Sequence, residues 1–256
     1  TAIHQHKSVR IVLLDFKKAF DLIDHTILLK KLSNFNIPPF IIRWIGSFLS
    51  DRNIRVKINK EVSDWLKING SVPQGSKLGP LLFVIMIDDL QISTPDTELY
   101  KYVDDGTASE IIASPSDSRM QQTLDTVSHW SKENSAQINP NKTVEMIINF
   151  RENWIDPPPL FINNTELVKV KTAKLLGLII SDDLTWTEHI NSICKKASKR
   201  LYYLILLRRS GLGKKDLLIY YKHIIRPVLE YCSVVWHTSI TKGQIDQIDH
   251  IQDRAL

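Results

Sequence analysis

The chain has 256 residues, 43% of them hydrophobic, and a formal net charge of +5, which suits one large globular domain or two smaller ones with a sizeable core. Its longest apolar runs, such as LLFVIMI at residues 81–87, are far shorter than the ~18 residues that span a bilayer. Membrane insertion is therefore disfavoured. Two cysteines cannot form a disulfide framework, so secretion is also disfavoured and an intracellular location is expected.

The first predicted element is a strand over residues 9–16, VRIVLLDF. Its nearly continuous aliphatic and β-branched side chains are typical of a strand buried on both faces, and the acid Asp15 lies at its end. The patterns that follow predict two helices near 24–34 and 39–49, then two strands over 54–59 and 65–69.

An apolar helix is predicted within residues 72–90, VPQGSKLGPLLFVIMIDDL, because Pro73 is a favoured helix-opening residue. Beyond it, YKYVDDGTAS places Asp104 and Asp105 between two short apolar runs, which predicts a β-hairpin with both acids at its tip. Asp-Asp-Gly is also ordinary turn chemistry, in which Gly106 would supply a positive φ and the acids would only be solvated.

The middle of the chain alternates between helix, turn and strand patterns. A helical stripe over 120–130 is followed by the turn INPNK at 138–142, which leads into the strand TVEMIINF. Three prolines make 151–159 a wide loop or linker. A hairpin that turns at Asn163 and Asn164 is expected next, and KLLGLII at 174–180 is predicted as a further strand.

The last region, residues 187–256, is predicted to be helical. Its first helix ends at Gly211 and Gly213, Pro227 is expected to kink or break a second run, and a last helix begins near Lys242. Residues 187–226 hold ten Lys or Arg and two acids, a net charge of +8, which suits either a polyanion or a solvated helix face. The first helix has one apolar stripe, formed by Ile190, Ile193, Ala197, Leu201 and Leu204.

The pattern as a whole predicts an α+β chain with three parts. An α+β domain covers 1–155, a small β element covers 156–186, and a basic helical region covers 187–256. This division places Asp15 and the Asp104/Asp105 pair in one domain. If the strand that ends in Asp15 pairs with the hairpin, three carboxylates converge, and such a cluster is costly unless cations neutralise it. Mg²⁺ prefers carboxylate oxygens, and two such ions can clamp an in-line phosphoryl transfer.

Five ordered motifs, spread over most of the chain, resemble those of one family. IVLLDFKKAFDLIDH, SVPQGSKLGPLLF, YVDD and INPNKT are similar to the first four catalytic motifs of reverse transcriptases, and KLLGLII is similar to their primer-grip element. Together with the tail IIRPVLEYCSVVW, they are most similar to non-LTR retrotransposons of the jockey-like and CR1-like kind. The resemblance implies a right-hand polymerase: a palm with partial fingers, formed by an antiparallel sheet backed by helices, then a helical thumb.

The resemblance also implies a role for individual residues in an RNA-directed DNA polymerase. Asp15 and Asp104 would be metal ligands together with the carbonyl of Phe16, Asp105 would be the third essential acid, and Lys142 would protonate the departing pyrophosphate. Phe20 would exclude a ribose 2′-OH, although an apolar aromatic residue is as often part of a core. The remaining implied contacts are Gln74 and Gly75 with the nucleotide, Leu176 and Gly177 with the primer, and Lys195, Lys196, Lys199 and Arg200 with the duplex.

The cofactors and partners follow from the same resemblance. They are two Mg²⁺ ions, with Mn²⁺ as a substitute, an RNA template, a DNA primer and dNTPs. Upstream fingers and endonuclease domains of a longer polyprotein are expected as well, in the nucleus and cytoplasm. Val103, Ser71 and Asp88 depart from residues that are common in the family, and none of them is an essential acid.

Two rival functions and one rival site remain open on the sequence. A truncated, inactive retroelement-derived module could bind nucleic acid without catalysis, and nucleotidyl cyclases use a similar two-metal palm. Zinc ligation by His189 with Cys194, or by Cys232 with His237, is disfavoured because neither pair has the spacing of a known ligand motif.

Overall fold

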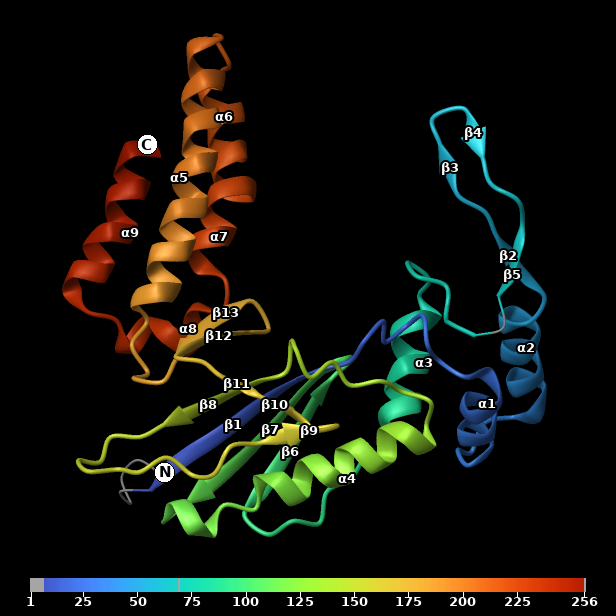
Figure 1. The fold of residues 1–256 in the computed structure, drawn as a ribbon. Helices are drawn as coiled ribbons and strands as arrows, with labels where there is room; N and C mark the ends of the chain where they lie inside the picture. Colours follow the sequence, from blue (N-terminus) through green and yellow to red (C-terminus); the bar gives the residue numbers. More distant parts are fainter. Residues whose placement is uncertain (1–6, 69, 256) are drawn as a thin grey trace. The chain divides into compact units, whose positions relative to one another are not determined.

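The computed structural model describes residues 7–68 and 70–255, and it divides into two compact units, Thr1–Lys169 and Val170–Leu256 (Figure 1). The domain boundaries expected at 155 and 186 remain a prediction.

The first unit is built on a five-stranded sheet with the order β11-β8-β1-β7-β6. The central strand β1 is antiparallel to both of its neighbours, β7 and β8, while the short edge strand β11 runs parallel to β8. The predicted central strand and the predicted hairpin are thus both present. The strands are β1 (Ser8–Asp15), β6 (Thr97–Tyr102), β7 (Asp105–Ile112), β8 (Val144–Ile148) and β11 (Val168–Lys169).

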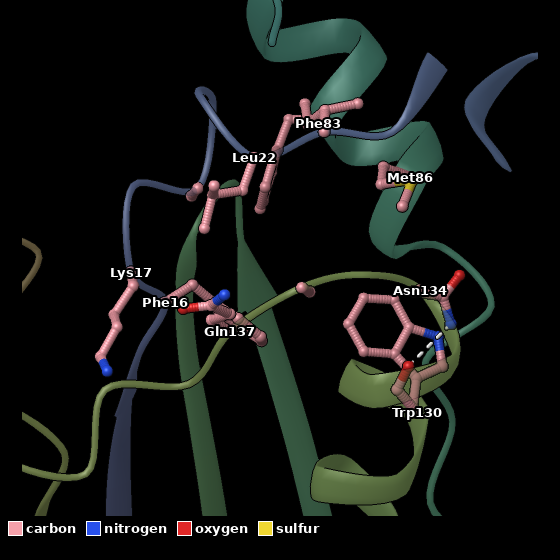
Figure 2. A pocket seen from close by; sticks show the side chains of 11 residues that line it. Phe16, Lys17, Leu22, Phe83, Met86, Trp130, Asn134 and Gln137 are labelled. Atoms are coloured by element: carbon pink, nitrogen blue, oxygen red, sulfur yellow. Dashed lines mark hydrogen bonds between the residues drawn. The ribbon is translucent and has the colours of Figure 1, made fainter. Parts of the chain in front are cut away.

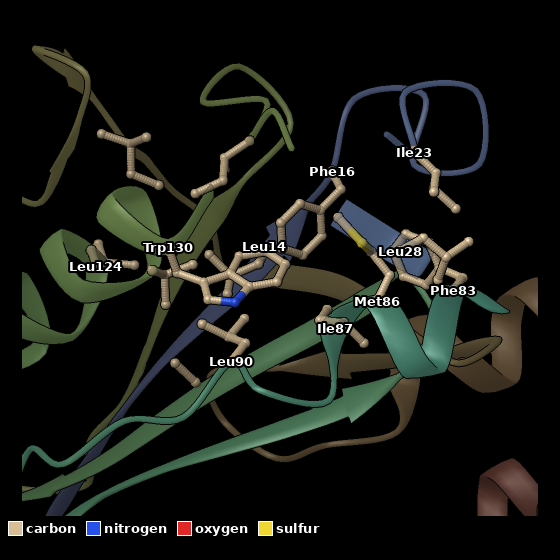
Figure 3. Close-up of a cluster of buried hydrophobic side chains, with 14 of the residues drawn as sticks. Leu14, Phe16, Ile23, Leu28, Phe83, Met86, Ile87, Leu90, Leu124 and Trp130 are labelled. Atoms are coloured by element: carbon tan, nitrogen blue, oxygen red, sulfur yellow. The ribbon is translucent and has the colours of Figure 1, made fainter. Parts of the chain in front are cut away.

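Helices cover one face of this sheet, and the core lies between them and β1. Alternate side chains of β1, Val12 and Leu14, are buried in a cluster with Trp130 of α4 and Met86 of α3 (Figure 3). Asp15 points to the opposite face, because side chains alternate along a strand. α4 (Met120–Glu133) packs on β7, and α3 (Leu78–Ile87) contributes Met86 to the same core, while α1 (His25–Ser33) packs against α3 and α2 (Pro39–Leu49).

The start of α3 differs from the expectation, because the helix begins at Leu78 and not at Pro73. Residues 71–77 form a turn in which Ser71 and Gly75 have φ angles of 73° and 78°. The hydroxyl of Ser76 donates to the Pro73 carbonyl over 2.7 Å and accepts from the Gly79 N–H. This local bonding holds the segment as a loop in front of the helix.

A long two-stranded hairpin lies between α2 and α3 in the sequence (Figure 1). The two predicted strands are each divided, because Asp64 is an extra residue on the second strand: Ile54 pairs with Leu66, while Lys57 pairs with Val62. An extra residue of this kind is a β-bulge. The hairpin contains β2 (Arg52–Ile54), β3 (Lys57–Ile58), β4 (Glu61–Val62) and β5 (Leu66–Ile68).

Arg10 attaches the proline-rich loop to the sheet, and the same side chain forms a buried ion pair within the sheet. Arg10 of β1 donates to Glu145 of β8 over 2.8 Å, and both side chains are almost fully buried. The same guanidinium donates to the carbonyl of Pro158 over 2.6 Å. The loop is followed by a hairpin, β9 (Phe161–Ile162) and β10 (Thr165–Glu166), which turns at two asparagines of positive φ as predicted.

The second unit starts with a hairpin where a single strand was expected. In KLLGLII, β12 (Thr172–Leu175) and β13 (Leu178–Ser181) pair antiparallel across a turn at Leu176 and Gly177, whose φ angles are 46° and 91°. The Tyr231 hydroxyl donates to the Leu176 carbonyl over 2.8 Å. A Cβ on Gly177 would be 2.9 Å from the Tyr231 ring, so glycine is required for this contact as well as for the turn.

The rest of the second unit is helical, as predicted, and the apolar stripe of α5 is buried in it. The run that contains Pro227 widens to a π-helical turn at Tyr221–Ile225, just before the proline, and breaks at Cys232, which has a φ of 51°. The helices are α5 (Thr187–Arg209), α6 (Lys214–Tyr220), α7 (Arg226–Glu230), α8 (Ser233–Trp236) and α9 (Lys242–Ala255).

In residues 7–68 and 70–255, none of the helices combines the length and the apolar character that a membrane span requires.

Candidate active site

Two of the predicted acids face each other across the sheet. Asp15, the last residue of β1, is the cross-strand partner of Asp105, the first residue of β7. Opposed residues of an antiparallel pair have Cβ atoms ≈ 4.5–5.5 Å apart, and like charges in such a pair are destabilising. Both lie on the face of the sheet that the helices do not cover. This arrangement places negative charge where a cation or a cationic ligand would stabilise it.

The third acid, Asp104, lies in the tight turn of the hairpin. Tyr102 pairs with Asp105, which leaves Val103 and Asp104 as the two turn residues. The positive φ expected at Gly106 is instead at Val103, with a value of 54°, which is an unusual conformation for a β-branched residue. Gly106 serves packing, because a Cβ at this position would be 3.3 Å from the Leu14 side chain on the neighbouring strand.

The predicted residues line one open hollow of about 650 Å³ in the first unit. Its wall contains two of the three acids, most of the predicted nucleotide-binding residues and the predicted proton donor. Asp105 and Gly75 do not line the hollow, but each is adjacent in sequence to a residue that does. The predicted residues in the wall are Asp15, Phe16, Phe20, Gln74, Asp104 and Lys142.

The end of β1 is held in place by the segment that carries Lys142. The Asp15 N–H donates to the Thr143 hydroxyl over 3.2 Å, and the Asp15 carbonyl accepts from the Asn139 N–H over 2.7 Å. Thr143 is fully buried. Sequence reasoning on INPNKT singled out only Lys142, although the same motif contains the residues that position Asp15.

The Phe16 carbonyl is directed away from this segment. Phe16 forms an isolated bridge with Ile138, and the two hydrogen bonds of the bridge use the groups of Asp15 and Lys17. Main-chain groups of successive residues in a ladder point to opposite sides. The carbonyl of Phe16 therefore points toward the side of β1 on which β7 and its hairpin turn lie.

Carboxylate oxygens and a main-chain carbonyl form the kind of hard oxygen donor set that suits Mg²⁺. Within the described residues, no three or more side chains of His, Cys, Asp or Glu are gathered as a metal-binding group. The strand pairing brings the backbones of the three acids together, with Asp15 opposite Asp105 and Asp104 in the adjacent turn. Asp15, Asp104 and the Phe16 carbonyl are the residues that could hold a metal, with Asp105 beside them.

Phe20 and Gln74 each have a partner that fixes their position in the wall. The ring of Phe20 packs against Phe83 of α3 with 5.2 Å between centroids, and its edge remains half-exposed in the hollow. The Gln74 amide donates to Asp21 over 3.0 Å. Asp21 also lines the hollow and was not predicted, although it belongs to the same DFKKAFD motif.

The helix side of the Asp15 strand is closely packed. Phe16 separates the hollow from a small cavity of about 20 Å³, which is surrounded mainly by the side chains of Phe83, Met86 and Trp130 (Figure 2). A site of this size and apolar lining has room for about one water molecule but few partners for it. The end of β1 is therefore supported on this side by apolar side chains of α3 and α4.

Two lysines bind the carboxyl end of α3, and one of them, Lys101, belongs to the hairpin of β6 and β7. Lys101 donates to the carbonyls of Ile87, Asp88 and Leu90 over 2.9–3.0 Å. Lys31 donates to the Met86 carbonyl and to Asp89. Burial lowers the pKa of both ammonium groups, against the opposing attraction of Asp89. These contacts fasten β6, and with it the turn that holds Asp104, to the helix that follows Gln74.

In the second unit, the basic residues of α5 differ in their contacts. Lys195, Lys196 and Lys199 are exposed on the surface, off the buried stripe. The Arg200 guanidinium instead donates to the Ile224 carbonyl in the π-helical turn. Three of the four predicted duplex-binding residues are therefore fully available to a phosphate backbone.

His189 and Cys232, one residue from each alternative zinc pair, have other places in the fold. His189 is buried, its Nδ1 accepts from the Ile179 N–H over 3.3 Å, and burial followed by the charge of Lys196 lowers its pKa. Cys232 is the left-handed residue that separates α7 from α8.

The fold and this arrangement of acids are typical of right-hand nucleic acid polymerases. The chain belongs to the family Reverse transcriptase (RNA-dependent DNA polymerase), which it matches over residues 1–180. A telomerase structure from Candida tropicalis, in complex with a fragment of telomeric RNA, has a TM-score of 0.51 at 14% identity and covers 97% of this chain and 42% of its own. That likeness confirms the predicted right-hand polymerase fold.

Curated proteins to which the chain is similar include polymerases of mobile elements. The chain is 26% identical to the probable RNA-directed DNA polymerase from transposon X-element of Drosophila melanogaster, over 100% of this chain and 28% of that protein. It is 29% identical to the RNA-directed DNA polymerase from mobile element jockey of the same species, over 95% of this chain and 27% of that protein. The resemblance to non-LTR retrotransposons is thus confirmed, and the chain spans about a quarter of the length of these relatives.

Proposed function

We propose that the chain is the palm and thumb part of an RNA-directed DNA polymerase, which transfers a nucleotidyl group from a dNTP to a primer 3′-OH on an RNA template. The observation that supports this most directly is the cross-strand pair Asp15 and Asp105, with Asp104 in the adjacent turn, at one hollow that also contains Lys142 and Gln74.

The roles within the site follow from its chemistry. Asp15 and Asp104 with the Phe16 carbonyl would hold two Mg²⁺ ions, or Mn²⁺, which when bound stabilise the charge of the attacking and leaving oxygens. Asn139 and Thr143 keep the Asp15 backbone in one position. Gln74, fixed by Asp21, faces the incoming nucleotide, and Lys142 is placed to give a proton to the departing pyrophosphate.

The second unit would hold the product duplex. Lys195, Lys196 and Lys199 are exposed cations that suit phosphate contacts, and the turn at Leu176 and Gly177 would contact the primer. Because the relatives are much longer, we infer that fingers and endonuclease domains of a polyprotein complete the protein, which would act in the nucleus and cytoplasm.

The test is template-dependent primer extension, measured on this chain and on a longer chain that includes the flanking segments of its reading frame. Asp104→Asn is expected to abolish dNTP incorporation and to leave binding of an RNA–DNA duplex within about twofold, because duplex binding depends on remote cations. The matched control is Asp96→Asn, an exposed acid near the start of β6.

Three outcomes are distinguishable. Incorporation by the wild type that is lost only in Asp104→Asn supports the proposal. Tight duplex binding with no incorporation by either wild-type chain would favour the inactive binding module. Conversion of a free nucleoside triphosphate to a cyclic product without template would favour the cyclase alternative.

A further inference from the structure

The hairpin of residues 52–68 has two chemically different faces. Its register sets them, because side chains alternate along each strand and cross-strand partners share a face. One face is mainly apolar and well exposed, with Ile54, Val56, Ile58 and Leu66, and it also includes Glu61 opposite Ile58. The other, which we term the basic face, contains Arg55, Lys57, Trp65 and Lys67, together with Val62 opposite Lys57.

The basic face is organised around Trp65. The Arg55 guanidinium lies over its ring, 4.5 Å from the centroid, and 60% of Trp65 is still exposed. Arg55 and Trp65 are opposite each other just before the Asp64 bulge, which increases local twist and turns the face. Lys57 is exposed, and Lys67 pairs only loosely with the exposed Asp51, over 3.4 Å, an interaction that contributes little.

The root of the hairpin is fastened next to the hollow. Arg52 donates to the carbonyls of Gly70 and Ser71 over 3.0 and 2.6 Å, and His25 contacts the same Ser71 carbonyl. The loop that begins there includes Gln74, which lines the hollow. The root of the hairpin is thus joined to one wall of the hollow by a short loop.

We propose that the basic face of the hairpin binds single-stranded nucleic acid, and that its occupant during synthesis is the unpaired template ahead of the hollow. An exposed aromatic ring beside several cations is the combination that holds a single strand, because the ring stacks on a base while the cations neutralise phosphates. A duplex keeps its bases stacked inside and gains nothing from Trp65. The template assignment rests on the proposed function, whereas the binding itself does not.

Binding is tested with fluorescently labelled oligonucleotides and the whole chain, by anisotropy. Trp65→Ala is expected to weaken binding of a single strand about fivefold or more and to leave a blunt duplex unaffected. Trp65→Phe should retain most of the affinity. Replacing Arg55, Lys57 and Lys67 together with Ala should lower the log–log salt slope for a single strand by about two, at ≈ 0.7 for each phosphate that is no longer neutralised.

The control variant is Ile58→Thr, which changes an equally exposed residue of the apolar face (67% exposed). It should leave single-strand affinity unchanged, and circular dichroism should show that all variants are folded. If Ile58→Thr weakens single-strand binding as much as Trp65→Ala does, the basic face has no special role. The hairpin would instead be a protein-docking element if Trp65→Ala left single-strand affinity unchanged and Ile58→Thr altered the association of the chain with a protein. That result would overturn the proposal.

The template assignment has a separate readout. A primer–template with a 5′ template overhang should bind more tightly than a blunt duplex to the wild type, and Trp65→Ala should remove most of that gain. Absence of any gain in the wild type would overturn the assignment. Because this experiment needs no catalysis, failure of primer extension alone would count against the proposed function and not against the hairpin site.

Discussion

The N–H of Asp15 donates a hydrogen bond to the hydroxyl of Thr143, a residue 128 positions later in the chain, over 3.2 Å. Thr143 is fully buried. The carboxylate that is central to the site is thus positioned by a side chain that makes no contact with substrate in the proposed reaction.

Thr143→Val tests this positioning. Valine has nearly the same shape and removes the acceptor, so the Asp15 N–H loses its partner at a cost of about 1–3 kcal/mol. We expect a lower melting temperature and a lower kcat for primer extension with little change in the KM for dNTP. Thr143→Ser keeps the hydroxyl and should restore kcat. A loss of stability with an unchanged kcat would show that the bond is only structural.

The Phe20 ring packs against Phe83, and Phe20 also lines the hollow. If its exposed edge lies beneath the sugar, Phe20→Val should raise kcat/KM for a ribonucleotide relative to its deoxy counterpart. If Phe20 only fills the core, Phe20→Ala should cost about 3–5 kcal/mol and reduce use of both substrates equally. A melting curve measured with the kcat/KM ratio separates the two, and we expect the ratio to change.

Lys101 contacts three carbonyls at the end of α3, where a cation also interacts favourably with the helix dipole. Lys101→Met retains the alkyl chain and removes the donors, so we expect the free energy of unfolding to fall by about 1–3 kcal/mol. Because Lys101 precedes the turn of Asp104, kcat should fall as well. Lys132→Met, at an exposed position of α4, is the control, and an equal effect there would refute a specific role.

Glu145 is the buried partner of Arg10. Glu145→Gln removes the carboxylate that pairs with Arg10, and breaking a buried pair costs up to about 3–5 kcal/mol, while the buried Glu110 opposite Arg10 still balances part of its charge. Chemical denaturation should show this loss for Glu145→Gln and a smaller one for the double variant Arg10→Met with Glu145→Met. A double variant no more stable than the single one would argue against an uncompensated charge as the cause.

His189 makes the second unit sensitive to pH. Its exposed fraction is 2%, and burial followed by the charge of Lys196 lowers its pKa. The unfolded chain then binds more protons than the folded one, so stability is complete above the unfolded value of about 6.5 and is lost as the pH falls through the lower folded pKa. Protonation would also remove Nδ1 as the acceptor for the Ile179 N–H.

Unfolding measured between pH 7.5 and 5.5 should show this slope in the wild type and a reduced slope in His189→Asn. His250→Asn, at an exposed position of α9, is the control. Equal slopes in the wild type and His189→Asn would contradict the prediction.

Many strands and helices of the first unit were predictable because their apolar residues form either a periodic pattern, as in α4, or a continuous run, as in β1 and α3. The errors fall where a turn interrupts the apolar pattern. Pro73 precedes a loop held by Ser76 rather than opening a helix. Leu176 and Gly177 have positive φ angles and turn KLLGLII into a hairpin, and the Tyr231 ring leaves no room for a Cβ at Gly177.

The candidate site was predictable to the extent that short motifs describe it. Motifs located Asp15, Asp104, Asp105, Gln74 and Lys142, and the structure brings these positions to one place. They did not indicate Thr143, Asp21 or Lys101, which act through hydrogen bonds between segments. No local pattern predicts such partners, because the register of strands far apart in the sequence decides them.

The central place of β1 in the sheet has a consequence for synthesis of the protein. Its two partner strands end at Ile112 and Ile148, so they leave the ribosome long after β1 does. At about 5–20 residues per second, β1 waits on the order of ten seconds for its last partner. During that time an apolar, β-prone segment is exposed with both edges unpaired, which is an aggregation hazard. Protection by a chaperone during translation would therefore matter more for this strand than for any later one in the sheet.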